Sequence, residues 1–387
     1  MPHPPLPLPL PADDAGPEAS RSSADDTSAG GGILPAALTA WLDARAEDLD
    51  AGPGLAAEVV PRLGAAGLFK AGVPAALGGL GGTTADAIGS IAAVAAHSLT
   101  AAFVFWGQRS FIEFLLQSPN AALRARWLAP LLAGESAGAT GLSNAMKHLA
   151  GIEALQVDAT RTASGWQLDG SLAWITNLRK EGFIAAAAVN MPGGAPPAVV
   201  AFGGSAADDG KGVVRSADLD LIALRGSNTA AVRLDAARVD DGAILHENAQ
   251  AWLPAVRPAF LGMQCGLSLG LARAALDAAQ ALPAGMRTPL LPRIGLLRTD
   301  LEAKAEELKT GVAEGRFQAA AAPLFRLRIA LAGIVQQAVM LELQARGGQA
   351  YLQARDGGFA RRWREAAFIP IVTPSLLQLQ AALDGQA

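Results

Sequence analysis

Cysteine and histidine are almost absent from this chain of 387 residues. The single cysteine, Cys265, excludes an internal disulfide and also a zinc ribbon or an iron–sulfur cluster held within one chain. The four histidines, which are His3, His97, His148 and His246, show no spacing typical of metal ligands. We therefore expect no metal site.

Charge is also sparse, and neither sign dominates. The 31 Lys and Arg residues stand against 35 Asp and Glu residues, which gives a formal net charge of -4. The cations are scattered along the sequence, whereas a nucleic-acid-binding surface needs them grouped in a patch or stripe. The composition therefore predicts no nucleic-acid partner.

A long uninterrupted apolar run is missing too, although 51% of the residues are hydrophobic. The nearest approach to a membrane span, residues 182–204, is interrupted by prolines and glycines between residues 192 and 197. Residues 1–33 are rich in Pro, Ser, Asp and Gly and lack a basic stretch followed by an apolar one, so they predict a disordered leader rather than a secretory signal. We expect a cytoplasmic protein without a membrane partner.

The sequence pattern changes twice along the chain, which is long enough for two or three domains. In residues 34–135 apolar residues recur three and four apart, as in segment 55–69, and this predicts a helical domain. In residues 136–248 Gly, Thr and Val with alternating polarity predict a β domain. The helical period returns over residues 249–387. The long helix candidates there are 259–281, 293–314, 323–346 and 374–383.

These parts define an α+β multidomain fold. Within the middle part, residues 166–170 are typical of a strand entering a turn, and residues 172–176 of its return. Several such runs, spaced about ten residues apart, predict an antiparallel β barrel or sandwich. The long C-terminal helices with short connections predict a four-helix bundle.

Seven segments, taken in chain order, are similar to recurrent segments of one protein family. They are GLFKAGVPAALGGLGG (67–82), WLAPLLAGE (127–135), GATGLSNAMKHLAG (138–151), LDGSLAWITN (168–177), LRGSNTAAVRLDAARV (224–239), ELQARGGQAYL (342–352) and RRWREAAF (361–368). In this order they resemble the acyl-CoA dehydrogenase superfamily of flavoproteins, over residues 55–380. The resemblance implies a helical N-terminal domain, a central β barrel or sandwich that binds flavin, and a C-terminal four-helix bundle.

A flavin ring needs a flat apolar surface, donors at its carbonyl edge, and a hydroxyl or amide near N5. By the resemblance, Trp174 and Thr176 lie against the ring, with Thr176 near N5 and Ile175 between them on the same strand. Leu142 and Ser143 would donate backbone or hydroxyl groups to the pyrimidine edge. The strand pattern alone favours Trp174 as an aromatic of the barrel core, and an ordinary turn hydroxyl stays open as the alternative for Ser143.

The resemblance also implies FAD as the cofactor and a homodimer or homotetramer that completes its site. In the family, glycines at the positions of Gly347 and Gly348 let a neighbouring subunit approach the adenosine half of FAD, whereas the residues alone suggest a helix C-cap. The family serine that helps to hold the pyrophosphate is replaced within the run 146–150, so FMN is possible as well.

The family's catalytic carboxylate is missing. An acyl-CoA dehydrogenase removes the α-proton of a thioester with a positioned carboxylate, and Thr373 occupies the usual Glu position here. The alternative position of the base, on the first helix of the last part, offers only Asp277, which an i,i+4 pair with Arg273 explains. Glu113 is a speculative substitute, although Arg109 four residues earlier offers it a structural pairing.

Three functions remain open. The first is a flavin-dependent oxidoreductase that oxidises a small acyl-CoA-like thioester by hydride transfer to flavin N5, with a non-standard or missing base. The second is a two-component monooxygenase of the same fold, which takes up reduced flavin and oxygen and needs no such base; His97, Gln108, Ser143 and His148 could then supply hydrogen bonds. The third is a non-catalytic assembly partner that keeps the fold and binds flavin, or keeps the fold alone. The overall resemblance places the first slightly ahead.

Overall fold

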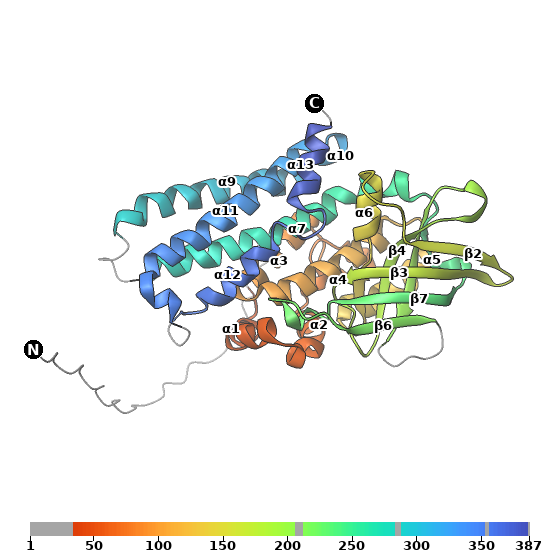
Figure 1. Cartoon of the computed structure of the whole chain (residues 1–387), viewed down its shortest axis with the longest axis horizontal. Helices are drawn as coiled ribbons and strands as arrows, with labels where there is room; N and C mark the ends of the chain where they lie inside the picture. Colours follow the sequence, from red (N-terminus) through yellow and green to blue (C-terminus); the bar gives the residue numbers. More distant parts are fainter. Residues whose placement is uncertain (1–33, 206–211, 283–287, 353–355, 386–387) are drawn as a thin grey trace, which may run out of the picture. The chain divides into compact units, whose positions relative to one another are not determined.

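Helices occupy both ends of the chain and strands its middle, as the computed structural model shows (Figure 1). The structure describes residues 34–205, 212–282, 288–352 and 356–385, so the expected leader of residues 1–33 lies outside the described residues. The N-terminal helices are α1 (Ala36–Ala51), α2 (Ala56–Ala65), α3 (Thr84–His97), α4 (Leu99–Gln117) and α5 (Ala121–Ala133).

Local capping sets the limits of these helices. α3 begins at a capping box: the Thr83 side chain accepts backbone N–H groups of the first turn, and the Asp86 side chain accepts the backbone N–H of Thr83. α4 begins where the Ser98 hydroxyl accepts the N–H of Ala101. α5 ends at Gly134, whose φ of 75° is available to glycine at little cost. Every residue of α4 from Leu99 to Leu115 is buried, so this helix forms the centre of the N-terminal part.

The middle of the chain folds into two four-stranded sheets. One contains β1 (Ala137–Thr140), β4 (Phe183–Val189), β5 (Ala198–Gly204) and β8 (Ile244–His246), and its β1–β4 pair is parallel. The other contains β2 (Val157–Thr162), β3 (Gly165–Ile175), β7 (Ala230–Val239) and β6 (Val213–Asp218), all antiparallel. Side chains of both sheets share one hydrophobic core, which makes the pair a sandwich.

The expected turn at Gly170 is wrong. β3 runs without a break from Gly165 to Ile175, and its hairpin partner is the preceding β2. The register with β7 shifts between Leu168 and Gly170, and Gly170 has a φ of 148°. A Cβ there would lie 2.1 Å from the carbonyl oxygen of Gln156. The glycine therefore allows a bulge and a close backbone approach within one strand rather than a reversal of the chain.

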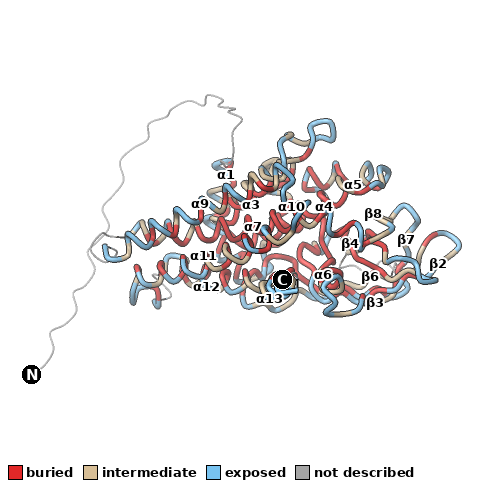
Figure 2. Tube along the Cα trace, turned by 90° about the horizontal axis from the view of Figure 1, so that it is seen from above, coloured by how far each residue is buried: buried red, intermediate tan, exposed pale blue. Residues whose placement is uncertain are grey.

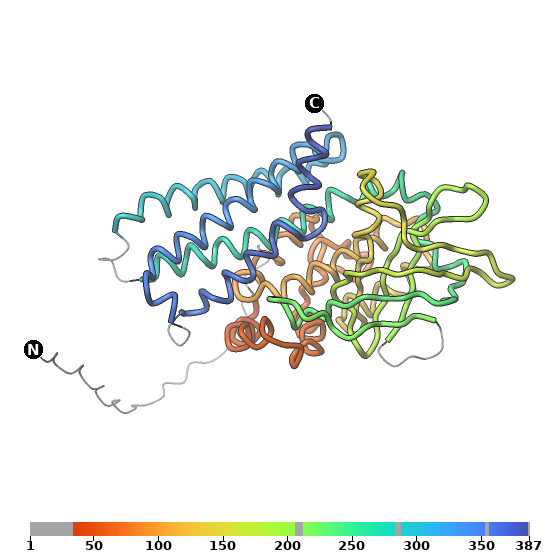
Figure 3. The backbone as a smooth tube through the Cα atoms, in the orientation of Figure 1, coloured from red at the N-terminus to blue at the C-terminus, as the bar shows by residue number. Residues whose placement is uncertain are grey.

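The described residues of the C-terminal part form helices joined by short connections. Its elements are α7 (Ala249–Gln280), α9 (Leu291–Ala313), α10 (Arg316–Ala319), α11 (Ala322–Arg346), α12 (Phe359–Phe368) and α13 (Leu376–Asp384). Three of these helices are long, whereas the candidate at 374–383 is the short α13. α7 contacts α9 and α11 of its own part and also α3 and α4 of the N-terminal part. α4 contacts both α7 and β1, so it connects the C-terminal helices with a sheet; Figure 3 shows the helices and the sheets side by side.

Two helices, α7 and α11 with the turn that follows it, are long and apolar enough to cross a membrane by length and composition. The apolar window of α7 is 89% buried inside the fold and that of the second helix 61% buried. Figure 2 shows α7 buried along most of its length. Both helices therefore use their apolar surface in the protein core.

A buried ion-pair cluster connects the first described helix to α12. The carboxylate of Asp50 on α1 is 1% exposed; it accepts hydrogen bonds from Nε and Nη2 of Arg364 and from the backbone N–H of Leu224. Glu365 is fully buried beside it and accepts from Arg361 and from the N–H of Leu99. The RRWR segment of the sequence thus anchors α12 to the N-terminal helices.

Candidate functional site

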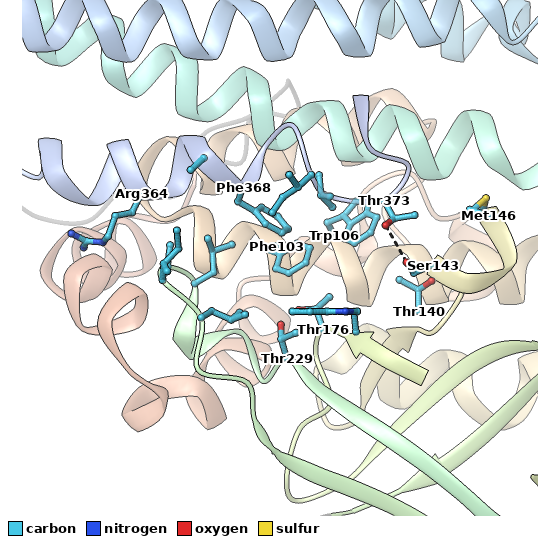
Figure 4. Close-up of a pocket in the computed structure, with 18 of the residues that line it drawn as sticks. Phe103, Trp106, Thr140, Ser143, Met146, Thr176, Thr229, Arg364, Phe368 and Thr373 are labelled. Carbon is cyan, nitrogen blue, oxygen red and sulfur yellow. Dashed lines mark hydrogen bonds between the residues drawn. The ribbon is translucent and has the colours of Figure 1, made fainter. Parts of the chain in front are cut away.

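A cavity of about 380 Å³ opens where all three parts of the fold meet (Figure 4). Its walls come from α4, the end of β1, α6 (Ser143–Leu149), the end of β3, the 221–224 loop, α7, α12 and the 371–373 segment. The residues that line it are Phe103, Trp106, Thr140, Ser143, Met146, Lys147, Trp174, Thr176, Leu221, Ile222, Ala223, Leu224, Thr229, Phe260, Arg364, Ala367, Phe368, Ile371, Val372 and Thr373.

Hydroxyl groups gather at one end of the cavity. Ser143, the first residue of α6, donates its hydroxyl to Oγ1 of Thr373 at 3.0 Å. The hydroxyl of Thr176 donates to the carbonyl of Ser227 at 3.2 Å. Thr140 is 7% exposed, and its hydroxyl has no hydrogen-bond partner among the described residues. A buried polar group without a partner is costly, so Thr140 is available to a bound molecule.

Two buried polar side chains, Gln264 and Arg328, hold the segment that carries Thr373. Gln264 of α7 donates Nε2 to the carbonyl of Thr373 at 3.0 Å and accepts Nε of Arg328 at 3.0 Å. Arg328 of α11 also donates to the carbonyl of Ile369. Burial lowers the pKa of this fully buried guanidinium. These bonds fix the backbone of residues 369–373 and so place the Thr373 hydroxyl opposite Ser143.

Four aromatic side chains form the middle of the cavity, and we call them the aromatic wall: Phe103, Trp106, Phe260 and Phe368. The rings of Phe103 and Trp106 are stacked with centroids 5.5 Å apart, and Phe368 meets Phe103 edge-on at 4.6 Å. Phe260 lies 4.9 Å from Trp106. The wall is apolar and largely closed to water.

Among the described residues, two charged side chains line the cavity, and both are paired. Nζ of Lys147 lies 3.3 Å from Glu153, and Nη2 of Arg364 lies 2.6 Å from Asp50. A hydrogen bond from Asn144, helped by Lys147, lowers the pKa of Glu153. Among the described residues that line the cavity there is no Asp, Glu, His, Cys or Tyr. No lining side chain can therefore take up a proton near neutral pH.

The residues expected to hold a flavin divide into two groups. Ser143, Trp174 and Thr176 line the cavity, and Trp174 is 60% exposed, so it is not an aromatic of the barrel core. The expectation that Ile175 belongs to the flavin site is corrected for its side chain, which is fully buried in the core between the two sheets and does not line the cavity. The side chain of Leu142 is likewise buried, directly before α6, and does not line the cavity.

Gly347 and Gly348 lie away from the cavity, where α11 ends. Gly347 has a φ of 54° and donates its N–H to the carbonyl of Leu343, as a helix C-cap does. The capping interpretation thus agrees with the structure, and the contact with a neighbouring subunit stays a prediction.

Glu113 does not reach the cavity. Its carboxylate accepts from Nη1 of Arg109 at 2.9 Å and from Gln117 at 2.7 Å, and the Arg109 side chain is fully buried. A carboxylate held in this way has a structural role, and Glu113 is therefore not placed to act as the missing base. Asp277 is not a base either, since it pairs with Arg298 of α9 at 2.6 Å rather than with Arg273 as expected.

Of the four side chains considered for an oxygenase, only Ser143 lines the cavity. His97 contacts Asp43 at 2.6 Å, and Nδ1 of His148 contacts the carbonyl of Glu153. Gln108 is buried, where it donates to the carbonyls of Leu131 and Ser136.

The sequence analysis missed the aromatic wall and Arg364. The wall combines residues of α4, α7 and α12, and those of different helices are more than 100 positions apart in sequence. The hydrogen bond between Trp106 and the carbonyl of Phe260 spans 154 residues. One signal was present: aromatic residues make up only 5% of the chain, yet Phe103, Phe105 and Trp106 fall within four positions.

Comparison with known proteins supports the resemblance. Residues 38–135 match the family described as acyl-CoA dehydrogenase, N-terminal domain. No curated protein sequence matches the chain. Among solved structures, the glutaryl-coenzyme A dehydrogenase–glutaryl-CoA complex is similar, with a TM-score of 0.74 and 19% identity over 90% of this chain and 94% of that one.

Two further structures have the same fold. KijD3 in complex with FMN and a dTDP-linked sugar has a TM-score of 0.74 and 20% identity, over 91% of each chain. Dibenzothiophene monooxygenase (TdsC) from Paenibacillus sp. A11-2 has a TM-score of 0.73 and 18% identity, over 89% of this chain and 93% of that one. The protein therefore has the acyl-CoA dehydrogenase fold, with helical, β and helical parts in the expected order.

Proposed function

We propose that the protein is a flavin-dependent monooxygenase that receives reduced flavin from a separate reductase and oxidises a small molecule in the cavity. The observation that carries this proposal is the absence of a proton acceptor among the described residues that line the cavity. Dehydrogenation of an acyl thioester needs a positioned base for the α-proton. Oxygen transfer from reduced flavin does not, so the geometry favours the second of the three functions over the first.

The residues present suit a flavin. Trp174 offers an exposed flat ring, and the hydroxyl of Thr140 is buried without a described partner beside those of Ser143 and Thr176. When bound in its reduced form, FAD or FMN would supply the electrons with which one atom of dioxygen enters the substrate and the other leaves as water. KijD3, which shares the fold, was solved with FMN, so both cofactors belong in the test.

The chain's own residues bind and orient the substrate and the flavin, and they exclude water from the reacting atoms. The hydroxyls of Ser143 and Thr373 form one hydrogen bond with each other, which leaves the second hydroxyl hydrogen, that of Thr373, free to donate to a polar atom of the substrate or flavin. The aromatic wall keeps water from the reacting atoms, and this suppresses unproductive release of reduced oxygen. The Gln264–Arg328 pair holds the Thr373 backbone in place for this contact.

We also propose that the chain forms a homodimer or homotetramer. Exposed apolar side chains border the cavity, since Trp174 is 60%, Ile222 78% and Ile371 67% exposed. A neighbouring subunit that covers them would remove this surface from water. Light scattering on the purified chain, with and without flavin, measures the number of subunits.

The deciding experiment supplies the protein with FAD and, separately, with FMN. Oxidised flavin is first titrated anaerobically with a panel of acyl-CoAs, and the visible flavin absorbance should stay unchanged. Reduced flavin is then mixed with oxygenated buffer, where the protein should make its reoxidation slower than that of free flavin. Bleaching by an acyl-CoA would overturn the proposal in favour of dehydrogenation. No binding of either redox form would instead favour a non-catalytic partner.

A further inference from the structure

The cavity offers no free positive charge to a substrate. Lys147 and Arg364 are its only cations, and each is within ion-pair distance of a carboxylate, Glu153 and Asp50 respectively. Asp50 is 1% exposed and bound on its other oxygen by the N–H of Leu224, so it is not free to release Arg364. The charge of each cation is balanced by its carboxylate partner, so a phosphate or carboxylate in the cavity would meet no net positive charge. The cavity is therefore built for an uncharged molecule.

The aromatic wall offers ring faces and edges and little else. Phe103 is 7% exposed and Trp106 and Phe260 are each 3% exposed. The only polar atom of the wall, the indole N–H of Trp106, already donates to the carbonyl of Phe260 at 3.2 Å. The stacked pair Phe103–Trp106, at an interplanar angle of 9°, and the edge-on ring of Phe368, at 64°, present both orientations that aromatic partners prefer.

Figure 4 shows how these features are ordered. Phe103, Trp106 and Phe368 lie between Arg364 at one end and the Ser143–Thr373 pair at the other. The hydroxyls of Thr176 and Thr229, beside the wall, already bond to the carbonyl and the hydroxyl of Ser227. A molecule against the wall therefore finds the Ser143–Thr373 pair at one of its ends. The volume of about 380 Å³ is at the lower end of the range of small-molecule sites.

We propose that the substrate is an uncharged aromatic small molecule whose ring lies against the aromatic wall and whose polar substituent faces the Ser143–Thr373 pair. The inference rests on the proposed monooxygenase function and deepens it by naming the substrate class. An aliphatic chain of equal size buries the same area but lacks the ring quadrupole, which adds about 0.5–1.5 kcal/mol for each aromatic contact.

The test compares matched probes by isothermal titration calorimetry on the protein saturated with flavin. Naphthalenemethanol and its fully saturated counterpart share one carbon skeleton and one hydroxyl and differ in aromaticity. We expect the aromatic probe to bind about 2- to 13-fold more tightly, which is one aromatic contact. Hexanoyl-CoA should bind more weakly than the aromatic probe. Equal affinities for the two alcohols, or tighter binding of hexanoyl-CoA, would overturn the inference.

A substitution locates the preference. Phe368→Leu removes a ring from the wall but keeps an apolar side chain, so the ratio of the two affinities should fall toward one. Trp363→Leu, on the same helix and outside the cavity, is the matched control and should leave the ratio unchanged. Phe103→Leu is a second variant if Phe368→Leu is unfolded by circular dichroism. A ratio that persists in both folded wall variants would contradict the assignment.

The outcomes for substrate class and for function are separable. The flavin and oxygen measurements use no aromatic probe, so they can succeed while the two alcohols bind equally, and only the substrate class then fails. If flavin does not bind, the same calorimetry on the flavin-free protein still compares the probes, and only the monooxygenase fails.

Discussion

Thr373 shows how one side chain limits the chemistry of a cavity. The Thr373 hydroxyl shares a hydrogen bond with Ser143 at 3.0 Å, but a neutral hydroxyl is too weak a base to hold a proton taken from carbon. No other described residue of the lining can act as the base. Glu113 is paired with Arg109 and does not line the cavity. The cavity can orient a substrate and exclude water, and these are the requirements of oxygen transfer.

Trp174 is the residue whose exposure is best explained by a bound ring. It is 60% exposed although it lines an apolar cavity. Trp174→Ala should weaken flavin binding about 2- to 13-fold, because one aromatic contact contributes about 0.5–1.5 kcal/mol. Fluorescence titration with FAD and FMN measures the affinity.

The control for this substitution is Trp363→Ala, since Trp363 is also exposed and does not line the cavity. It should leave flavin affinity unchanged. An unaltered affinity in Trp174→Ala would remove Trp174 from the flavin site.

Cys265 gives a second prediction at the residue scale. It is fully buried in α7, and burial raises the pKa of its thiol to about 12. Because the thiolate is the reactive form, the native protein should not react with Ellman's reagent, whereas the urea-unfolded chain should release one equivalent. Rapid reaction of the folded protein would show that α7 opens locally.

Local sequence motifs predicted those residues of the site that stand in or near a recognisable segment. Ser143, Trp174 and Thr176 stand in segments that resemble the family, and Thr373 occupies the position where the family has its glutamate. All four line the cavity. The aromatic wall could not be predicted in this way, because Phe260 and Phe368 become neighbours of α4 only when the helices pack. Single aromatic residues on apolar helices carry no pattern that distinguishes a cavity from a core.

At the scale of elements, α7 and α3 pack closely through three glycines spaced four residues apart. A Cβ added to Gly266 would meet the carbonyl oxygen of Ile88 at 2.9 Å, and one added to Gly270 would meet that of Ala92 at 2.2 Å. Gly262 faces Ile88 more loosely. The spacing places the three glycines on one face of α7, where they allow the two backbones to approach. This contact brings α4, next to α3, and Phe260 of α7 to the same cavity.

Gly270→Ala should therefore destabilise the protein by about 1–3 kcal/mol, because the methyl group has no space between the helices. The matched control is Gly333→Ala in the interior of α11, where a Cβ meets nothing within 4 Å. Alanine is the better helix former by about 1 kcal/mol, so this variant should be as stable as the wild type or more stable. Urea unfolding followed by circular dichroism compares them, and equal losses in both variants would contradict the packing argument.

Element order was predictable from the sequence, and local exceptions were not. The period of apolar residues located α9 and α11 within two residues of their observed limits, because each of these helices buries one face. Gly170 misled for a physical reason: glycine permits a turn and a bulge equally, and only the pairing of β3 with β2 and β7 decides between them.

At the scale of the whole molecule, one buried carboxylate ties the three parts together. Asp50 belongs to the first helical part. One of its oxygens accepts the N–H of Leu224 in the β part, and the other accepts the guanidinium of Arg364 in the last part. Both partners line the cavity. The site therefore depends on an ion-pair cluster that also sets the response of the fold to pH.

Glu365 makes that response measurable. Burial raises its pKa from the ordinary value of 4.5 to about 6, with Arg361 opposing the shift and the nearby charge of Asp50 adding to it. A carboxyl with a raised pKa binds its proton more tightly in the folded state than in the unfolded chain. Its contribution to stability is complete below pH 4.5 and is lost as the pH rises through about 6.

Glu365→Gln removes the titration but keeps an acceptor for the N–H of Leu99. The free energy of unfolding of the wild type, minus that of the variant, should fall by about 2 kcal/mol in total between about pH 3 and 7.5, the equivalent of the full pKa shift. Urea unfolding across this range measures the difference, with Glu247→Gln as a control for the loss of an exposed carboxylate. A difference that rises with pH would mean that Arg361 outweighs burial and that the cluster holds Glu365 ionised. The same experiment in an Asp50→Asn background should show a smaller fall, because the neighbouring negative charge that adds to the shift is gone.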